Sequence, residues 1–255
     1  MIFYFSATGN SKYAAERIAK ATGDRLVSLS DAVRQRRWRY ELAWDEPIGF
    51  VTPVYFAGLP SILRFFLGKL SLENLREQYV YLVMTCGSLT GDAAGQFGKL
   101  LKKKGLTLSA QFGIPMVDNY IPVFTIPDQA SQHRILDAAE THIDDAIRAI
   151  RARGIGDYNR FRGHAPELLT AVGYQAYAHH RPTSPFLVTG ACISCGLCQE
   201  ICPCGAITLA GGKPQWRKKQ CVHCFACLHR CPTEAIRWRD PEEARGRYYN
   251  PRVEP

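Results

Sequence analysis

The chain has 255 residues, 46% of them hydrophobic, and a formal net charge of +9. This length and apolar fraction fit one large domain, or a medium domain with a small one, and argue against disorder. No apolar run is long enough to span a bilayer, and the first ten residues lack the basic segment and cleavage site of a signal peptide. We therefore expect a cytoplasmic protein.

The positive charge raises the question of nucleic-acid binding. The segment RQRRWRY at 34–40 mixes arginines with aromatic residues, as nucleic-acid-binding segments often do. We interpret it instead as a solvated connection between core elements and expect no nucleic-acid partner.

The first half of the chain alternates apolar, strand-like runs with segments of helical periodicity. Runs rich in branched or aromatic residues predict strands at 1–5, 25–30, 48–53, 79–87 and 106–117. The spacing of apolar residues predicts helices at 12–22, 59–70, 93–104 and 131–153. Strands and helices that alternate in this way predict an α/β fold, with a parallel sheet covered by helices on both faces.

The pattern weakens after Gly154. One further helix is predicted over 165–180, and RPTSP at 181–185 is typical of a linker. We therefore divide the chain into a first domain, a linker with a helix, a cysteine-rich domain and a tail, with boundaries at 1–154, 155–185, 186–240 and 241–255.

Nine of the ten cysteines lie between Cys192 and Cys231, in an internal repeat with an offset of 29 residues. Disulfides are not expected in a cytoplasmic protein, and consecutive Cys-x-x-Cys pairs would compete for the middle sulfur. Structural zinc takes pairs of ligands from two loops, whereas three cysteines in one loop would crowd a single tetrahedron. The spacing C-x2-C-x2-C-x3-C-P is instead typical of four-iron clusters.

On these runs, residues 186–238 resemble a bacterial-type ferredoxin with two [4Fe-4S] clusters. The resemblance implies that the fourth cysteine of each run serves the other cluster. The implied ligand sets are Cys192, Cys195, Cys198 and Cys231 for one cluster, and Cys221, Cys224, Cys227 and Cys202 for the other. Cys204 lies outside the pattern, either as a small residue beside a cluster or as an active thiol. His223 and His229 either tune a cluster by hydrogen bonding or fill a loop.

A second candidate site is the loop FSATGNS at 5–11, between a predicted buried strand and a helix. Such a loop offers unpaired backbone N–H groups and the positive end of a helix dipole. It lacks the lysine of a P-loop and the G-x-G-x-x-G of a dinucleotide site. Hydroxyl and amide side chains suit a single phosphate held by hydrogen bonds. The alternative is a bare helix-capping turn.

Residues 1–154 resemble flavodoxin, whose phosphate loop reads [ST]-x-T-G-x-[ST], as residues 6–11 do here. The resemblance implies a doubly wound five-stranded parallel sheet in the order 2-1-3-4-5, with FMN at the carboxyl ends of the strands. Tyr55 or Phe56 would stack on the flavin ring or pack in the core. The expected FMN-binding residues are Ser6, Ala7, Thr8, Gly9, Asn10, Ser11, Pro53, Val54, Tyr55, Phe56, Ala57, Gly58, Cys86, Gly87, Ser88, Gly91, Asn119 and Tyr120.

Taken together, the two halves resemble the flavodoxin–ferredoxin fusion proteins of anaerobic bacteria and archaea. The chain is basic, whereas flavodoxins are usually acidic. Two clusters and one FMN phosphate, at about −2 each, would lower the formal charge from +9 to about +3. Much of the apparent basicity would then offset bound cofactors.

The resemblance implies a carrier that relays low-potential electrons between redox partners through two [4Fe-4S] clusters and FMN. The donor and the acceptor are unidentified. An FMN-dependent oxidoreductase that acts on a small molecule and a redox sensor are the alternatives.

Overall fold

The computed structural model describes residues 1–240 and 245–254. Its main element is a parallel sheet whose strands follow the order β2-β1-β4-β6-β7-β8. Their bounds are β1 (Ile2–Tyr4), β2 (Leu26–Ser28), β4 (Ile48–Pro53), β6 (Val80–Cys86), β7 (Ala110–Pro115) and β8 (Gly156–Asp157). The first five positions confirm the predicted order. The sixth strand, β8, was not predicted because two residues carry no periodicity.

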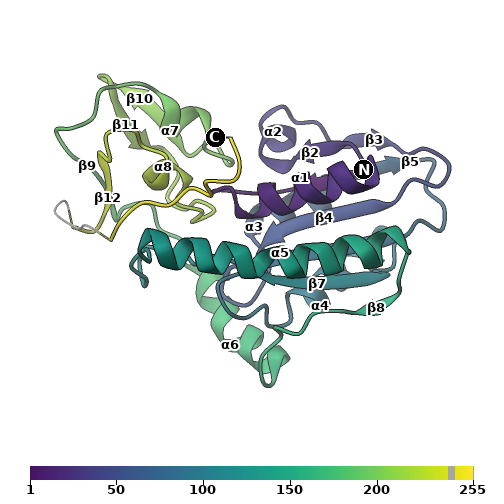
Figure 1. Cartoon of the computed structure of the whole chain (residues 1–255). Coiled ribbons are helices and arrows are strands. Elements are labelled where there is room, and N and C mark those ends of the chain that lie inside the picture. The colour runs from purple at the N-terminus through teal and green to yellow at the C-terminus, as the bar shows by residue number, and fades with distance from the viewer. Residues whose placement is uncertain (241–244, 255) are drawn as a thin grey trace.

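Helices cover both faces of this sheet (Figure 1). One face packs against α1 (Asn10–Thr22) and α5 (Gln129–Arg151), and the other against α2 (Leu29–Arg34), α3 (Ser61–Lys69) and α4 (Ala93–Lys102). The predicted strand at 25–30 ends early, because Ser28 accepts a hydrogen bond from Asp31 N and caps α2. Among the described residues, no helix is both long and apolar enough to cross a bilayer.

The arginine-rich segment 34–40 runs from the end of α2 into β3 (Arg39–Glu41). Strand β3 pairs in parallel with β5 (Ser71–Glu73) at the side of the main sheet. Trp38 packs edge-to-face on Phe65, with ring centroids 5.7 Å apart. Tyr40 is buried and packs edge-to-face on Phe3 at 5.0 Å, so both aromatic residues of this segment are packing residues.

The cysteine-rich part forms a second lobe at one end of the main sheet (Figure 1). It contains β9 (Phe186–Val188), α7 (Leu197–Glu200), β10 (Ile207–Ala210), β11 (Lys213–Trp216), α8 (Ala226–His229) and β12 (Ile236–Trp238). The sequence repeat is also a structural repeat, since α7 and α8 each follow a residue in left-handed backbone conformation, Gly196 (φ 81°) and Phe225 (φ 54°).

Helix α6 (Pro166–His179) ties the two lobes together. The Tyr174 hydroxyl donates to Leu59 O at 2.7 Å, and the Tyr177 hydroxyl donates to Val222 O at 3.0 Å. Val222 lies between two cysteines of the second run and packs in the same hydrophobic core as the main sheet. These contacts hold the second cysteine run against the loop that follows β4.

Residues 245–254 return from the cysteine-rich lobe to the start of α1 (Figure 1). Asn250 is fully buried, and its N–H donates to Thr8 O at 2.8 Å. Tyr248 N donates to His229 Nδ1 at 3.2 Å, so the same segment also contacts α8. We call residues 245–254 the C-terminal strap.

Candidate functional site

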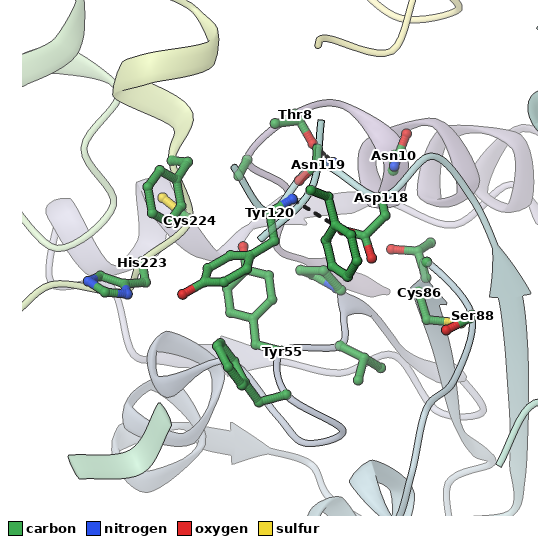
Figure 2. Close-up of a pocket in the computed structure, with 18 of the residues that line it drawn as sticks. Thr8, Asn10, Tyr55, Cys86, Ser88, Asp118, Asn119, Tyr120, His223 and Cys224 are labelled. Atoms are coloured by element: carbon green, nitrogen blue, oxygen red, sulfur yellow. Dashed lines mark hydrogen bonds between the residues drawn. The ribbon is translucent and has the colours of Figure 1, made fainter. Parts of the chain in front are cut away.

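A cavity of about 450 Å³ lies at the carboxyl ends of β1, β4, β6 and β7 (Figure 2). Its size is typical of a small-molecule site. Fifteen of the expected residues line it, namely Ser6, Ala7, Thr8, Asn10, Ser11, Pro53, Val54, Tyr55, Phe56, Ala57, Cys86, Gly87, Ser88, Asn119 and Tyr120.

The loop before α1 forms the polar end of this cavity. Thr8 Oγ1 accepts from Asn119 Nδ2 at 2.8 Å, and Ser6 Oγ accepts from Gly9 N at 3.1 Å. Both hydroxyls thus keep their own hydrogen to donate. The first turn of a helix also has backbone N–H groups without an intrahelical acceptor. The loop therefore offers several donors to an anion.

The Asn10 side chain makes several contacts within the protein. Its Nδ2 donates to Val117 O at 3.0 Å, and its Oδ1 accepts from the Tyr248 hydroxyl at 2.6 Å and from Asn250 Nδ2 at 3.1 Å. These bonds use the amide oxygen and one of the two Nδ2 hydrogens. The side chain thus supports the loop, and its predicted contact with a ligand stays a prediction.

Three expected glycines are absent from the cavity lining, and each makes room for a neighbouring element. A Cβ on Gly9 would lie 2.8 Å from Asn250 Cβ, and one on Gly58 would lie 2.2 Å from Tyr174 Cδ2. Gly91 has φ +57° and packs against Ala57. These glycines are needed for close packing, which the loop sequences alone could not distinguish from ligand contact.

Aromatic side chains form the apolar wall. Phe56 stacks on Tyr177 with centroids 5.7 Å apart, and it contacts Tyr120 edge-to-face at 5.1 Å. Tyr55 packs toward Phe5 and the core, whereas Phe56 keeps 39% of its surface exposed. Phe56 is thus the better placed of the two expected aromatics to cover a planar ligand.

Asp118 is a cavity residue that sequence reasoning missed. Its Oδ1 accepts from Tyr120 N at 3.1 Å, and a Cβ on Gly87 would lie 2.2 Å from its Oδ2. The carboxyl group therefore lies directly against the loop after β6. Burial raises the pKa of Asp118.

Cys86 lies next to this carboxyl group. Burial, with a smaller effect of the Asp118 charge, raises the pKa of Cys86 to about 12. A thiol that stays protonated at neutral pH is a poor nucleophile, which favours a packing role for Cys86.

The cluster cysteines gather around two small cavities. One is lined by Cys192, Cys195, Cys198 and Cys231, and the other by Cys202, Cys204, Cys221, Cys224 and Cys227. The structure thus brings together the two crossed sets that the ferredoxin resemblance implies. That they hold clusters stays a prediction.

Cys224 lies in both sites, since it lines a cysteine cavity and also the loop cavity (Figure 2). His223 and Phe225 line the loop cavity beside it. The His223 ring Nε2 lies 2.8 Å from Pro182 O, so this side chain is held by the linker. The sequence held no local signal that Cys224 lines the loop cavity, because the second cysteine run is more than 100 residues from the loops after β1, β4 and β6.

Comparison with known proteins identifies both lobes. Residues 1–115 match the model of the flavodoxin domain, and residues 191–235 match that of the 4Fe-4S dicluster domain. The "ferredoxin-like protein in nif region" of Trichormus variabilis and that of Trichormus azollae are each 38% identical over 48 residues. This match covers 18% of the chain and 41% of each relative, so the chain spans about two fifths of their length.

Among solved structures, the Trp repressor binding protein from Bacillus subtilis matches 55% of this chain and 94% of its own. The sequence identity is 18% and the TM-score 0.33, and we draw no conclusion from a likeness of this extent.

Fold, motifs and family matches agree that the chain combines a flavodoxin domain with a 4Fe-4S dicluster domain. It is a flavodoxin–ferredoxin fusion.

Proposed function

We propose that the protein relays low-potential electrons between redox partners through two [4Fe-4S] clusters and one FMN. The observation that carries this proposal is the double position of Cys224, which lines a cluster cavity and the loop cavity at once. A cluster bound there would lie against the flavin. The proposal assigns residues 1–154 to the FMN domain, 155–185 to the linker, 186–240 to the ferredoxin domain and 241–255 to a tail, of which 241–244 and 255 lie outside the described residues.

The donor set of the loop cavity fits FMN. The Ser6 and Thr8 hydroxyls and the N–H groups at the start of α1 suit its phosphate, and the aromatic wall at Phe56 suits its ring. Bound FMN would supply chemistry with either one or two electrons per step. The chain itself binds the phosphate, orients the ring and excludes water from its face.

The two cysteine cavities differ in their position. We call the set Cys202, Cys221, Cys224 and Cys227 the flavin-side site, and the set Cys192, Cys195, Cys198 and Cys231 the outer site. Cys195 is exposed, whereas Cys202 and Cys227 are buried. We propose that a redox protein exchanges electrons at the outer site, and that the flavin-side site connects it to FMN. The unpaired thiolates suit the reducing cytoplasm.

The test is rapid reduction of the clusters in anaerobically purified protein, which should hold about eight iron atoms and one FMN. We expect the flavin to bleach with a first-order rate constant that does not change with protein concentration, because the tether keeps the centres together. A rate that scales with concentration would show transfer between molecules. Zinc in place of iron would overturn the cluster assignment itself.

Replacing Asp118 by asparagine should raise the midpoint potential of the bound flavin at neutral pH. Above its raised pKa the carboxylate is charged and disfavours the negative charge that reduction adds. Below that pKa it is neutral, like asparagine, so the difference between the two proteins should shrink as the pH falls. Cys86 stays a thiol throughout this range.

Spectroelectrochemical titration at several pH values measures this effect. The matched control is Asp145→Asn, which removes an exposed carboxylate that pairs with Arg148 on α5. Equal potentials for Asp118→Asn and the wild type at all pH values would place Asp118 away from the flavin.

A second candidate function is direct reduction of a small apolar molecule by FMN. Four exposed apolar residues from separate loops and α6 line the cavity, namely Leu89, Val123, Phe124 and Leu169. Such residues suit an apolar substrate at the mouth as well as a cover for the ring. Turnover of small aromatic acceptors by the reduced protein, without any partner, would favour this function over the carrier.

A further inference from the structure

Cys204 is the one cysteine of the cysteine-rich lobe that belongs to neither ligand set. It nevertheless lines the flavin-side site, and its Sγ lies 3.9 Å from Cys202 Sγ. The side chain is half-buried, and Lys218 Nζ donates to the Cys204 carbonyl, which holds the loop in place. The ferredoxin pattern gives this thiol no role.

The internal repeat supplies a counterpart for it. Twenty-nine residues further on lies Thr233, whose Oγ1 is 3.8 Å from Cys231 Sγ at the outer site. The two fourth cysteines, Cys202 and Cys231, also each accept from a backbone N–H four residues later, and both distances are 3.2 Å. These two contacts therefore match, except that one site has a thiol where the other has a hydroxyl.

Building on the proposed function, we propose that Cys204 is not a ligand but a hydrogen-bond donor to the Cys202 thiolate, and that it thereby sets the redox potential of the flavin-side cluster. It would occupy the place that Thr233 fills at the outer site. Reduction of such a cluster takes up one electron from a one-electron reductant, and no bond forms or breaks. A donor that points at a ligand sulfur stabilises the added negative charge, so the hydrogen bond raises the potential.

The proposal predicts an order of midpoint potentials among variants at position 204, because a thiol is a weaker hydrogen-bond donor than a hydroxyl. Cys204→Ala removes the donor, and Cys204→Ser replaces it with a stronger one of similar shape. The midpoint potential of the flavin-side cluster should be lowest with alanine, intermediate in the wild type and highest with serine. Thr233→Val is the matched control, and it should lower the potential of the outer cluster alone.

The measurement is a redox titration of the loaded protein with dithionite, followed by EPR, with Cys192→Ser to assign the signals. Equal potentials for alanine, cysteine and serine at position 204 would show that Cys204 only fills space. Loss of about half the iron in Cys204→Ala would make it a ligand and overturn the proposal. If the wild-type protein does not bind two clusters, the proposed function is wrong, and the role of Cys204 that rests on it is wrong too.

Discussion

Replacing Asn250 by alanine is expected to weaken FMN binding by up to about tenfold while leaving the iron content unchanged. Asn250 supports the phosphate loop twice, through its N–H to Thr8 O and through its Nδ2 to Asn10 Oδ1. Alanine keeps the backbone N–H, but Asn10 Oδ1 would then accept from the Tyr248 hydroxyl and no longer from Asn250. The loss of one such hydrogen bond costs about 0.5–1.5 kcal/mol. A cost of about 1.4 kcal/mol in the bound state corresponds to a tenfold change in affinity.

Two further variants make this experiment specific. Tyr248→Phe removes the other donor to Asn10 Oδ1 and should also weaken FMN binding. Tyr249→Phe is the matched control, since its hydroxyl donates to Glu254 O within the C-terminal strap and not to Asn10. Flavin fluorescence titration of the flavin-free protein gives the affinities, and an iron assay checks the clusters. Loss of iron together with flavin would mean that the strap stabilises the cysteine-rich lobe instead.

The second large effect is expected from a pair of repeat-equivalent cysteines, Cys221 and Cys192. Cys221→Ser should abolish reduction of the flavin by the clusters, because it disrupts the flavin-side site. Cys224 of that site also lines the loop cavity. Cys192→Ser should remove a similar amount of iron from the outer site and leave internal transfer from the remaining cluster intact. The two variants thus make the same chemical change at equivalent positions, one at the flavin-side site and one at the outer site.

Rapid reduction of both variants with a small donor, which needs no docking surface, measures this difference. Iron and flavin contents must be determined first, so that a variant without FMN is not counted as one without transfer. Equal flavin bleaching in the two variants would show that the flavin-side site is not the obligatory connection.

The sequence predicted best what depends on neighbours along the chain. Alternating runs and helical spacing predicted a parallel sheet covered by helices, and the flavodoxin resemblance implied the order of its first five strands. The loop at 6–11 followed from a local motif. The end of the strand at Ser28 and the six-residue helix α2 after it were missed, because they depend on a side-chain cap and not on an apolar pattern. Local patterns thus predicted the framework and most of the cavity lining.

Contacts between distant segments were beyond such reasoning. Tyr177 and Cys224 reach the cavity only because α6 holds the second cysteine run beside the loop after β4. The motif predicts that Asn10 binds a ligand, but its amide oxygen accepts hydrogen bonds from Tyr248 and Asn250, about 240 positions away. A polar residue in a loop can bind either a ligand or a distant side chain. A single sequence does not show which of the two it binds.

The C-terminal strap also constrains the order of assembly during protein synthesis. Tyr248 and Asn250, which hold Asn10 of the phosphate loop, follow that loop in the chain by almost 240 residues. At about 5–20 residues per second, the interval between them lasts on the order of ten seconds or more. The loop stays without this support until the strap has been made, and both cysteine runs are made within that interval. On the proposed function, firm binding of a flavin would therefore follow the synthesis of all eight cysteines of the two ligand sets.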